Sequence, residues 1–169
     1  MRTLSIKRAC VVVVAIALFG FGAVSQAAED DVAVIVNKSN PAASLAMAEL
    51  RKILLGPRPK WSSGMDITVL MTQPGQSERS ATIKIVCGMS ETDFMLHFVR
   101  TWRKHDGSSN AASGDAPRVF DSGAQLRQSV ASTPGAIGFI KASQVDNSVR
   151  VVAIDGNLPG QAAYKLKLQ

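Results

Sequence analysis

The sequence predicts a single α/β domain in which strands and helices alternate along the chain. Three observations favour this fold class. The length of 169 residues suits one domain, short β-branched apolar runs recur, and amphipathic segments separate them. No internal repeat and no linker-like composition divides the sequence.

The first 27 residues have the pattern of a secretory signal peptide. Arg2, Lys7 and Arg8 form a basic head, an apolar run of 16 residues covers 9–24, and small residues surround Gln26 before the expected cut after Ala27. We therefore expect a signal peptide at 1–27, a mature domain at 28–169 with no membrane span, and a periplasmic location in a Gram-negative cell. The alternative, an uncleaved anchor, is disfavoured because a spanning helix needs about 20 residues.

The mature chain is expected to begin with a strand and then a helix. Val32 to Val36 is a β-branched apolar run, typical of a strand buried on both faces. Ser44 is expected to cap a helix whose apolar positions extend to Leu55. The helix should end at Gly56, where we expect a left-handed residue before Pro57.

The middle of the chain predicts a strand, a turn and two helices. Ile67 to Met71 is the strand, and the Pro/Gly turn from Gln73 to Ser77 leads into a helix at about 78–87. Gly88 should break this helix. Ser90 then caps a second helix that runs through Trp102, with acids in its first turn.

The last third predicts three strands, a further helix and a turn. The segment 106–117 is poor in apolar groups and is expected to be a mobile surface loop. The expected elements after it are, in order, a short strand at Val119-Phe120, a helix capped by Asp121 or Ser122 and ending near Ser132, a turn at Pro134-Gly135, a strand from Ala136 to Ile140 and a strand from Val149 to Ile154.

Charge and cysteine content limit the possible functions. Without Arg2, Lys7 and Arg8, the formal charge falls from +6 to about +3, which is too mild to predict nucleic-acid binding. The mature chain keeps one cysteine, Cys87, so it has no internal disulfide. We expect this thiol on a buried face.

No catalytic or metal-binding arrangement is recognisable in the sequence. The only histidines are His97 and His105, and they lack further ligands at a metal-binding spacing, so we interpret His97 as a packed helix residue. Catalytic triads and phosphate loops are also absent, so we predict no enzyme activity, no metal and no cofactor. The basic cluster formed by Arg100, Arg103, Lys104 and His105 is interpreted as a solvated helix end, or as a docking patch for an acidic partner or membrane headgroups.

An ordered set of short pieces resembles a known family. The pieces are Val34-Ile35-Val36-Asn37, Asn40-Pro41, Ser44-Leu45, Glu49-Leu50-Arg51, Ile53, Leu55-Gly56, Trp61, Gly64, Ile67-Thr68-Val69 and Pro134-Gly135-Ala136-Ile137-Gly138-Phe139. Together they resemble the phosphate-type substrate-binding proteins of ABC transporters, and most closely their short relatives that retain only part of the two-lobed fold. The resemblance implies a single periplasmic-binding-protein-like lobe with a mixed sheet flanked by helices.

The same resemblance implies an oxyanion site in the loop after the strand Ile67–Met71. Free amides at a helix N-terminus, a glycine, a hydroxyl and an arginine together suit phosphate oxygens. The candidate residues are Gly75, Gln76, Ser77 and Arg79.

The loop departs from the family pattern in two ways. Thr72 stands where an upstream arginine is expected, and Glu78 places a negative charge where a neutral hydroxyl is usual. The strand and loop of a first lobe also have no counterpart, since only Ala28 to Asp31 precede the first expected strand.

Two functional hypotheses follow. The first is an exported solute-binding-type protein for phosphate or a related oxyanion, working with a transporter permease. The second is a non-enzymatic accessory protein with a degenerate ligand site that binds another envelope protein.

Overall fold

The structure is a computed structural model that describes residues 31–57, 59–105 and 116–168, with side chains described except at 101–105. The predicted signal peptide, most of the predicted 106–117 loop, and the side chains of Arg103, Lys104 and His105 therefore lie outside the described residues. In the described part, no helix is long and apolar enough to cross a membrane.

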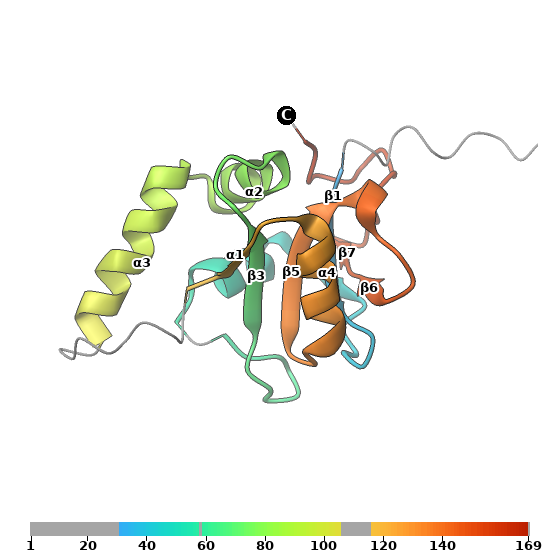
Figure 1. Cartoon of the computed structure of the whole chain (residues 1–169), viewed down its shortest axis with the longest axis horizontal. Coiled ribbons are helices and arrows are strands. Elements are labelled where there is room, and N and C mark those ends of the chain that lie inside the picture. The colour runs from blue at the N-terminus through green and yellow to red at the C-terminus, as the bar shows by residue number, and fades with distance from the viewer. Residues whose placement is uncertain (1–30, 58, 106–115, 169) are drawn as a thin grey trace, which may run out of the picture.

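A five-stranded mixed sheet forms the centre of the molecule (Figure 1). Its order is β4-β3-β5-β1-β6, and a separate two-stranded sheet pairs β2 with β7. The strands are β1 Val32–Asn37, β2 Ser44–Leu45, β3 Thr68–Thr72, β4 Arg118–Phe120, β5 Ala136–Lys141, β6 Val149–Val151 and β7 Ala153–Ile154. β3 is parallel to both β4 and β5, whereas β1 is antiparallel to both β5 and β6.

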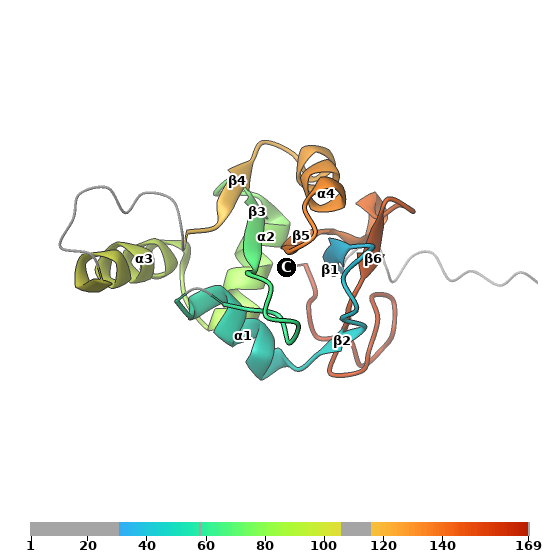
Figure 2. The ribbon, with the colours of Figure 1, turned by 90° about the horizontal axis from the view of Figure 1, so that it is seen from below.

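Helices cover both faces of this sheet, as Figure 2 shows from below. α4, Gly123–Ser132, lies on one face, and α1, Met47–Leu55, lies on the other with α2, Ser77–Thr82. α2 continues directly into a π-helical turn, η1, Ile83–Cys87. α3, Glu91–His105, stands at the side of the molecule, and a short 3-10 turn, η2, Ala142–Gln144, follows β5 (Figure 1).

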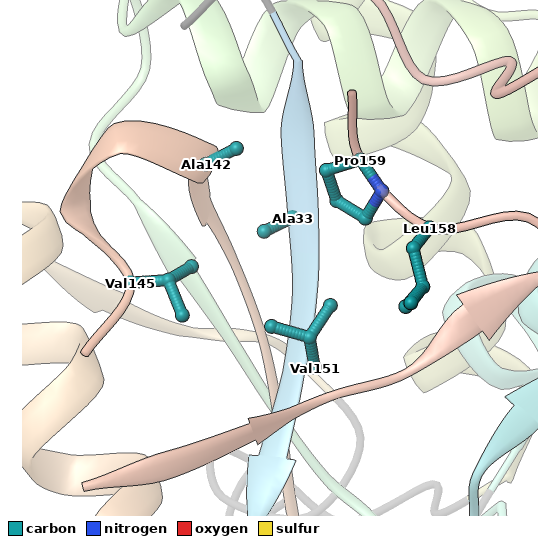
Figure 3. A pocket seen from close by; sticks show the side chains of 6 residues that line it. All are labelled: Ala33, Ala142, Val145, Val151, Leu158 and Pro159. Carbon is teal, nitrogen blue, oxygen red and sulfur yellow. The ribbon is translucent and has the colours of Figure 1, made fainter. Parts of the chain in front are cut away.

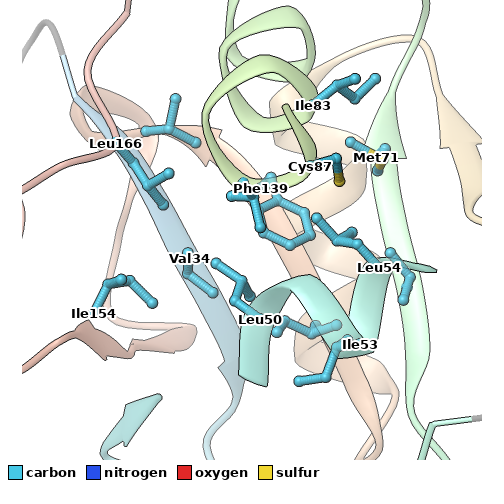
Figure 4. Close-up of a cluster of buried hydrophobic side chains, with 14 of the residues drawn as sticks. Val34, Leu50, Ile53, Leu54, Met71, Ile83, Cys87, Phe139, Ile154 and Leu166 are labelled. Atoms are coloured by element: carbon cyan, nitrogen blue, oxygen red, sulfur yellow. The ribbon is translucent and has the colours of Figure 1, made fainter. Parts of the chain in front are cut away.

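Alternating side chains of β1 enter two separate cores. Val34 and Phe139 belong to the larger core, which α1, η1 and α3 complete (Figure 4). Ala33 and Ile35 point to the opposite face, where Leu126 of α4 packs. Because both faces of β1 are covered, the whole strand is buried, as its β-branched run predicts.

Two local predictions are wrong. Ser44 does not cap a helix, because Ser44-Leu45 pairs as a strand with β7, and α1 begins at Met47 instead. The Glu49 carboxylate accepts from the Ala46 N–H at 2.8 Å, and the Asp155 carboxylate accepts from the Met47 N–H at 2.9 Å. Gly56 is not left-handed, since its φ is −81°; a Cβ there would lie 2.5 Å from the Lys52 carbonyl oxygen, so glycine is needed for space.

Other sequence signals are confirmed. Ser122 caps α4 through its hydroxyl, and Gly88 ends the α2–η1 helix with a φ of +68°. The predicted strand 149–154 is present in two parts, β6 and β7. Its backbone changes partner: the Val152 N–H bonds to Val34 in β1, and the Ala153 N–H bonds to Ala43 ahead of β2.

The tail after β7, for which the sequence predicted no element, closes over the start of β1. The Leu166 carbonyl accepts from the Val32 N–H at 2.8 Å, and the Tyr164 hydroxyl donates to the Val32 carbonyl at 2.6 Å. The fully buried Asp31 forms an ion pair with Lys167 at 2.7 Å. These contacts make the tail part of the larger core.

Candidate functional site

The predicted oxyanion loop connects β3 to α2 at the carboxyl end of a parallel strand. This end of a parallel sheet is where ligands bind in open α/β folds. Gly75 has a φ of +91°, so the turn requires a residue that tolerates the left-handed region. The Gln73 N–H donates to the Phe120 carbonyl at 3.1 Å, and the Gln73 amide donates to Asp121, so the loop is fixed to the end of β4.

The first turn of α2 offers donors to this loop. The Ser80 N–H makes the first intrahelical bond, to the Gln76 carbonyl at 3.0 Å, so the helix leaves the N–H groups of Ser77, Glu78 and Arg79 without an acceptor of its own. Such a helix end favours negative charge. Gly75 and Gln76 are exposed and Ser77 is half-buried, so three of the four predicted residues lie together at the surface of the turn.

The fourth predicted residue, Arg79, is only 2% exposed. Its guanidinium already has partners within the chain. Nε and Nη2 both contact Glu91 Oε1, at 2.8 and 2.7 Å, and Nη1 donates to the Thr72 carbonyl at 3.0 Å. Met95 Sδ lies 3.7 Å from Nη2, and the Phe94 ring centroid lies 6.0 Å from Cζ.

Both residues whose oxygen atoms accept from the guanidinium carry a buried oxygen atom that lacks a hydrogen-bond partner. Glu91 Oε2 and Thr72 Oγ1 are buried atoms without a hydrogen-bond partner. The Thr72 residue is 1% exposed, whereas 31% of the Glu91 side chain is exposed. Glu91 is therefore the more exposed partner of this ion pair.

Glu78 places a second carboxylate in the first turn of α2. It is 2% exposed at the start of α2, and the Ser77 hydroxyl donates to its Oε2 at 3.3 Å. The helix dipole favours a carboxylate there, but the same charge repels an anion in the loop. Among these three groups, two carboxylates outnumber one guanidinium.

Sequence reasoning did not identify Glu91 as part of the site. The acids of the 91–93 segment were interpreted through the helix dipole alone. Arg79 and Glu91 are 12 residues apart in two different helices, so no periodicity connects them. Only the packing of α3 on α2 brings the two side chains together.

The remaining titratable groups of interest serve the core. His97 Nε2 lies 2.9 Å from the Leu55 carbonyl oxygen, and its ring packs edge-on against Phe98, in agreement with its interpretation as a packed residue. Burial raises the pKa of the Cys87 thiol to about 12. Among the described residues, no group of three or more metal-binding side chains is close enough to hold a metal ion.

Two of the hollows on the described surface lie beside α1 and beside β1. One, of about 470 Å³, lies between α1 and the loop that contains Trp61. The other, of about 280 Å³, is an apolar depression beside β1 (Figure 3), and it is lined by Ala33, Ala142, Val145, Val151, Leu158 and Pro159.

Comparison with known proteins identifies the fold. The family model described as "PBP superfamily domain" matches residues 23–168. No curated protein matches the chain. Among solved structures, a protein from Clostridium perfringens that is assigned as a phosphate ABC transporter substrate-binding protein, with bound phosphate, is 25% identical over 77% of this chain and 47% of that chain, with a TM-score of 0.59.

Two further structures share the fold. An ABC-type phosphate transport receptor from Vibrio cholerae is 21% identical over 82% of this chain and 54% of that chain, with a TM-score of 0.64. PstS from Borrelia burgdorferi is 16% identical over 83% of this chain and 55% of that chain, with a TM-score of 0.61. The chain thus spans about half the length of these structures, and the predicted fold class is confirmed.

Proposed function

The chain belongs to the PBP superfamily, and on that premise we propose that it is an exported, non-enzymatic solute-binding-type protein for phosphate or a related small oxyanion. The observation that carries the proposal is the β3–α2 loop, where the first turn of α2 carries free amides, the Ser77 hydroxyl and the buried Arg79. Helix-end amides and arginine are the groups that recognise phosphate oxygens. The likeness to a structure with bound phosphate supports the same ligand class.

Each predicted residue has a distinct part in this proposal. Gly75 lets the backbone approach the ligand, and Gln76 and Ser77 supply polar side chains at the surface of the turn. Arg79 supplies the positive charge of the site from a buried position beside the Glu91 carboxylate.

A ligand bound at this loop would contact the described part of this chain on one side. The chain spans about half the length of the solved relatives, and a partner would cover the other side of the ligand. We propose a transporter permease or another envelope protein in that role, and a periplasmic location for both.

A second function is favoured by the pairing of Arg79 with Glu91. With Arg79 held by Glu91 and with Glu78 beside it in the chain, the site would be degenerate, and the chain would be an accessory protein that binds an envelope partner without an oxyanion. The two proposals differ in a direct binding measurement.

Calorimetric titration of the purified chain with phosphate, sulfate and a neutral sugar separates them. Saturable binding of one oxyanion, weakened several-fold in Ser77→Ala and lost in Arg79→Ala, is the expected result. Arg118→Ala is the matched control, because Arg118 is an exposed arginine on β4 and should leave affinity unchanged. If the folded wild-type chain gives no heat of binding with any of the three ligands, the accessory protein is favoured.

A further inference from the structure

We propose that Glu91 is an internal competitor for the oxyanion, which holds Arg79 in the unliganded chain and must release it before an oxyanion binds. This inference rests on the proposed function and adds a residue that sets the affinity of the site. It starts from the contacts of the guanidinium, whose Nε and Nη2 are both directed at the Glu91 carboxylate. These two nitrogens form the edge that arginine offers to two-oxygen anions.

Glu91 uses this edge incompletely. One oxygen, Oε1, accepts from both nitrogens, while Oε2 is buried without a hydrogen-bond partner. An oxyanion that offers one oxygen to each nitrogen would form the two parallel bonds that the carboxylate does not. It would therefore be a better partner for Arg79 than Glu91 is.

Release of Arg79 does not require α3 to unfold. Glu91 is the first residue of α3, and 31% of its side chain is exposed, so a rotation about its own side-chain bonds takes the carboxylate into water. Phe94 and Phe98, which attach α3 to the larger core, keep their positions in this movement. The Glu91 carboxylate is thus a partner that a ligand can replace while Arg79 stays in place.

The test is the phosphate affinity of the purified wild-type chain and of Glu91→Gln, measured by titration calorimetry with inorganic phosphate. The neutral amide keeps the size of the side chain but removes the charge that competes for Arg79. We expect Glu91→Gln to bind phosphate about tenfold more tightly, because the ligand no longer displaces a charged partner. Glu91→Asp, whose shorter side chain keeps the charge away from Nε, should change in the same direction and serves if the amide variant folds poorly.

Asp93→Asn is the matched control. Asp93 lies in the same helical turn as Glu91, and its replacement by Asn removes the same charge. Its carboxylate accepts from the Ser90 hydroxyl at 2.7 Å and does not contact Arg79. A gain in Glu91→Gln that Asp93→Asn does not share supports competition at the guanidinium.

The outcomes separate this inference from the proposed function. If the wild-type chain binds phosphate and folded Glu91→Gln binds it no more tightly, Glu91 is a structural partner only, while the proposed function stands. Equal gains in Glu91→Gln and Asp93→Asn would also overturn the inference, because they would reflect overall charge. If neither the wild-type chain nor any folded variant binds phosphate, both the proposed function and the role of Glu91 as a competitor are overturned.

Discussion

Cys87 shows how burial at a single residue changes chemistry. The thiol is 1% exposed, and its burial raises the pKa to about 12, against a smaller opposite effect of Arg51. The nucleophile is the thiolate, so the folded chain should react with iodoacetamide at pH 8 far more slowly than the chain unfolded in urea. Equal rates in the two states, measured by mass spectrometry on the chain without 1–27, would contradict this burial.

The same shift predicts how stability depends on pH. Above the unfolded pKa of roughly 8.5, the unfolded chain releases the Cys87 proton while the folded chain keeps it. The folded state then binds more protons than the unfolded state, so the stability that the neutral thiol contributes is present below this pKa and declines as the pH rises toward about 12.

Single residues were also where the sequence was least informative about the candidate site. The turn at Gly75 follows from local chemistry, because few residues other than glycine tolerate a φ of +91°. The burial of Arg79 does not, because its partner is on another helix and the two become neighbours only through tertiary packing.

At the scale of elements, the cap of α4 gives a measurable prediction. Ser122 Oγ accepts from the Gln125 N–H at 3.3 Å, so Ser122→Ala should lower the free energy of unfolding by about 1 kcal/mol in urea denaturation. Ser129→Ala is the control within the same helix; it should change stability by less than about 0.5 kcal/mol, because alanine is the better helix former. An equal loss in both variants would mean that the cap contributes nothing.

Elements with strong local signals were predicted, and those set by distant partners were not. The helix cap of Ser122 and the stop at Gly88 are local, and both are present. Ser44 has an equally good local signal for a cap, but its segment pairs with β7 far along the chain. The tail around Leu166 has no periodic pattern, and it is ordered by its contacts with β1.

At the scale of the whole molecule, the predicted export can be tested by the mature N-terminus. If 1–27 is a cleaved signal peptide, mass spectrometry of the chain from the periplasm of a Gram-negative host should give Ala28 as the first residue. Replacing Arg2, Lys7 and Arg8 by neutral residues should retain the uncleaved precursor. An intact N-terminus on the wild-type periplasmic chain would refute the cleavage.

The fold class was predictable because it depends on composition and alternation along the chain. The order of the strands was not predictable. β1 has apolar residues on both faces, and these indicate that the strand is buried but not which strands lie beside it. The mixed sheet came from the family resemblance, and the structure agrees with it.

The central position of β1 has a consequence for how the chain is made. β1 is the first strand of the sheet, yet both of its neighbours, β5 and β6, belong to the last third of the chain, and Val34 pairs with Phe139 about a hundred residues later. A chain that is still leaving the ribosome has no partner for this strand, and such distant pairing also slows folding. The topology therefore leaves β1 without its sheet partners until β5 and β6 have been synthesised.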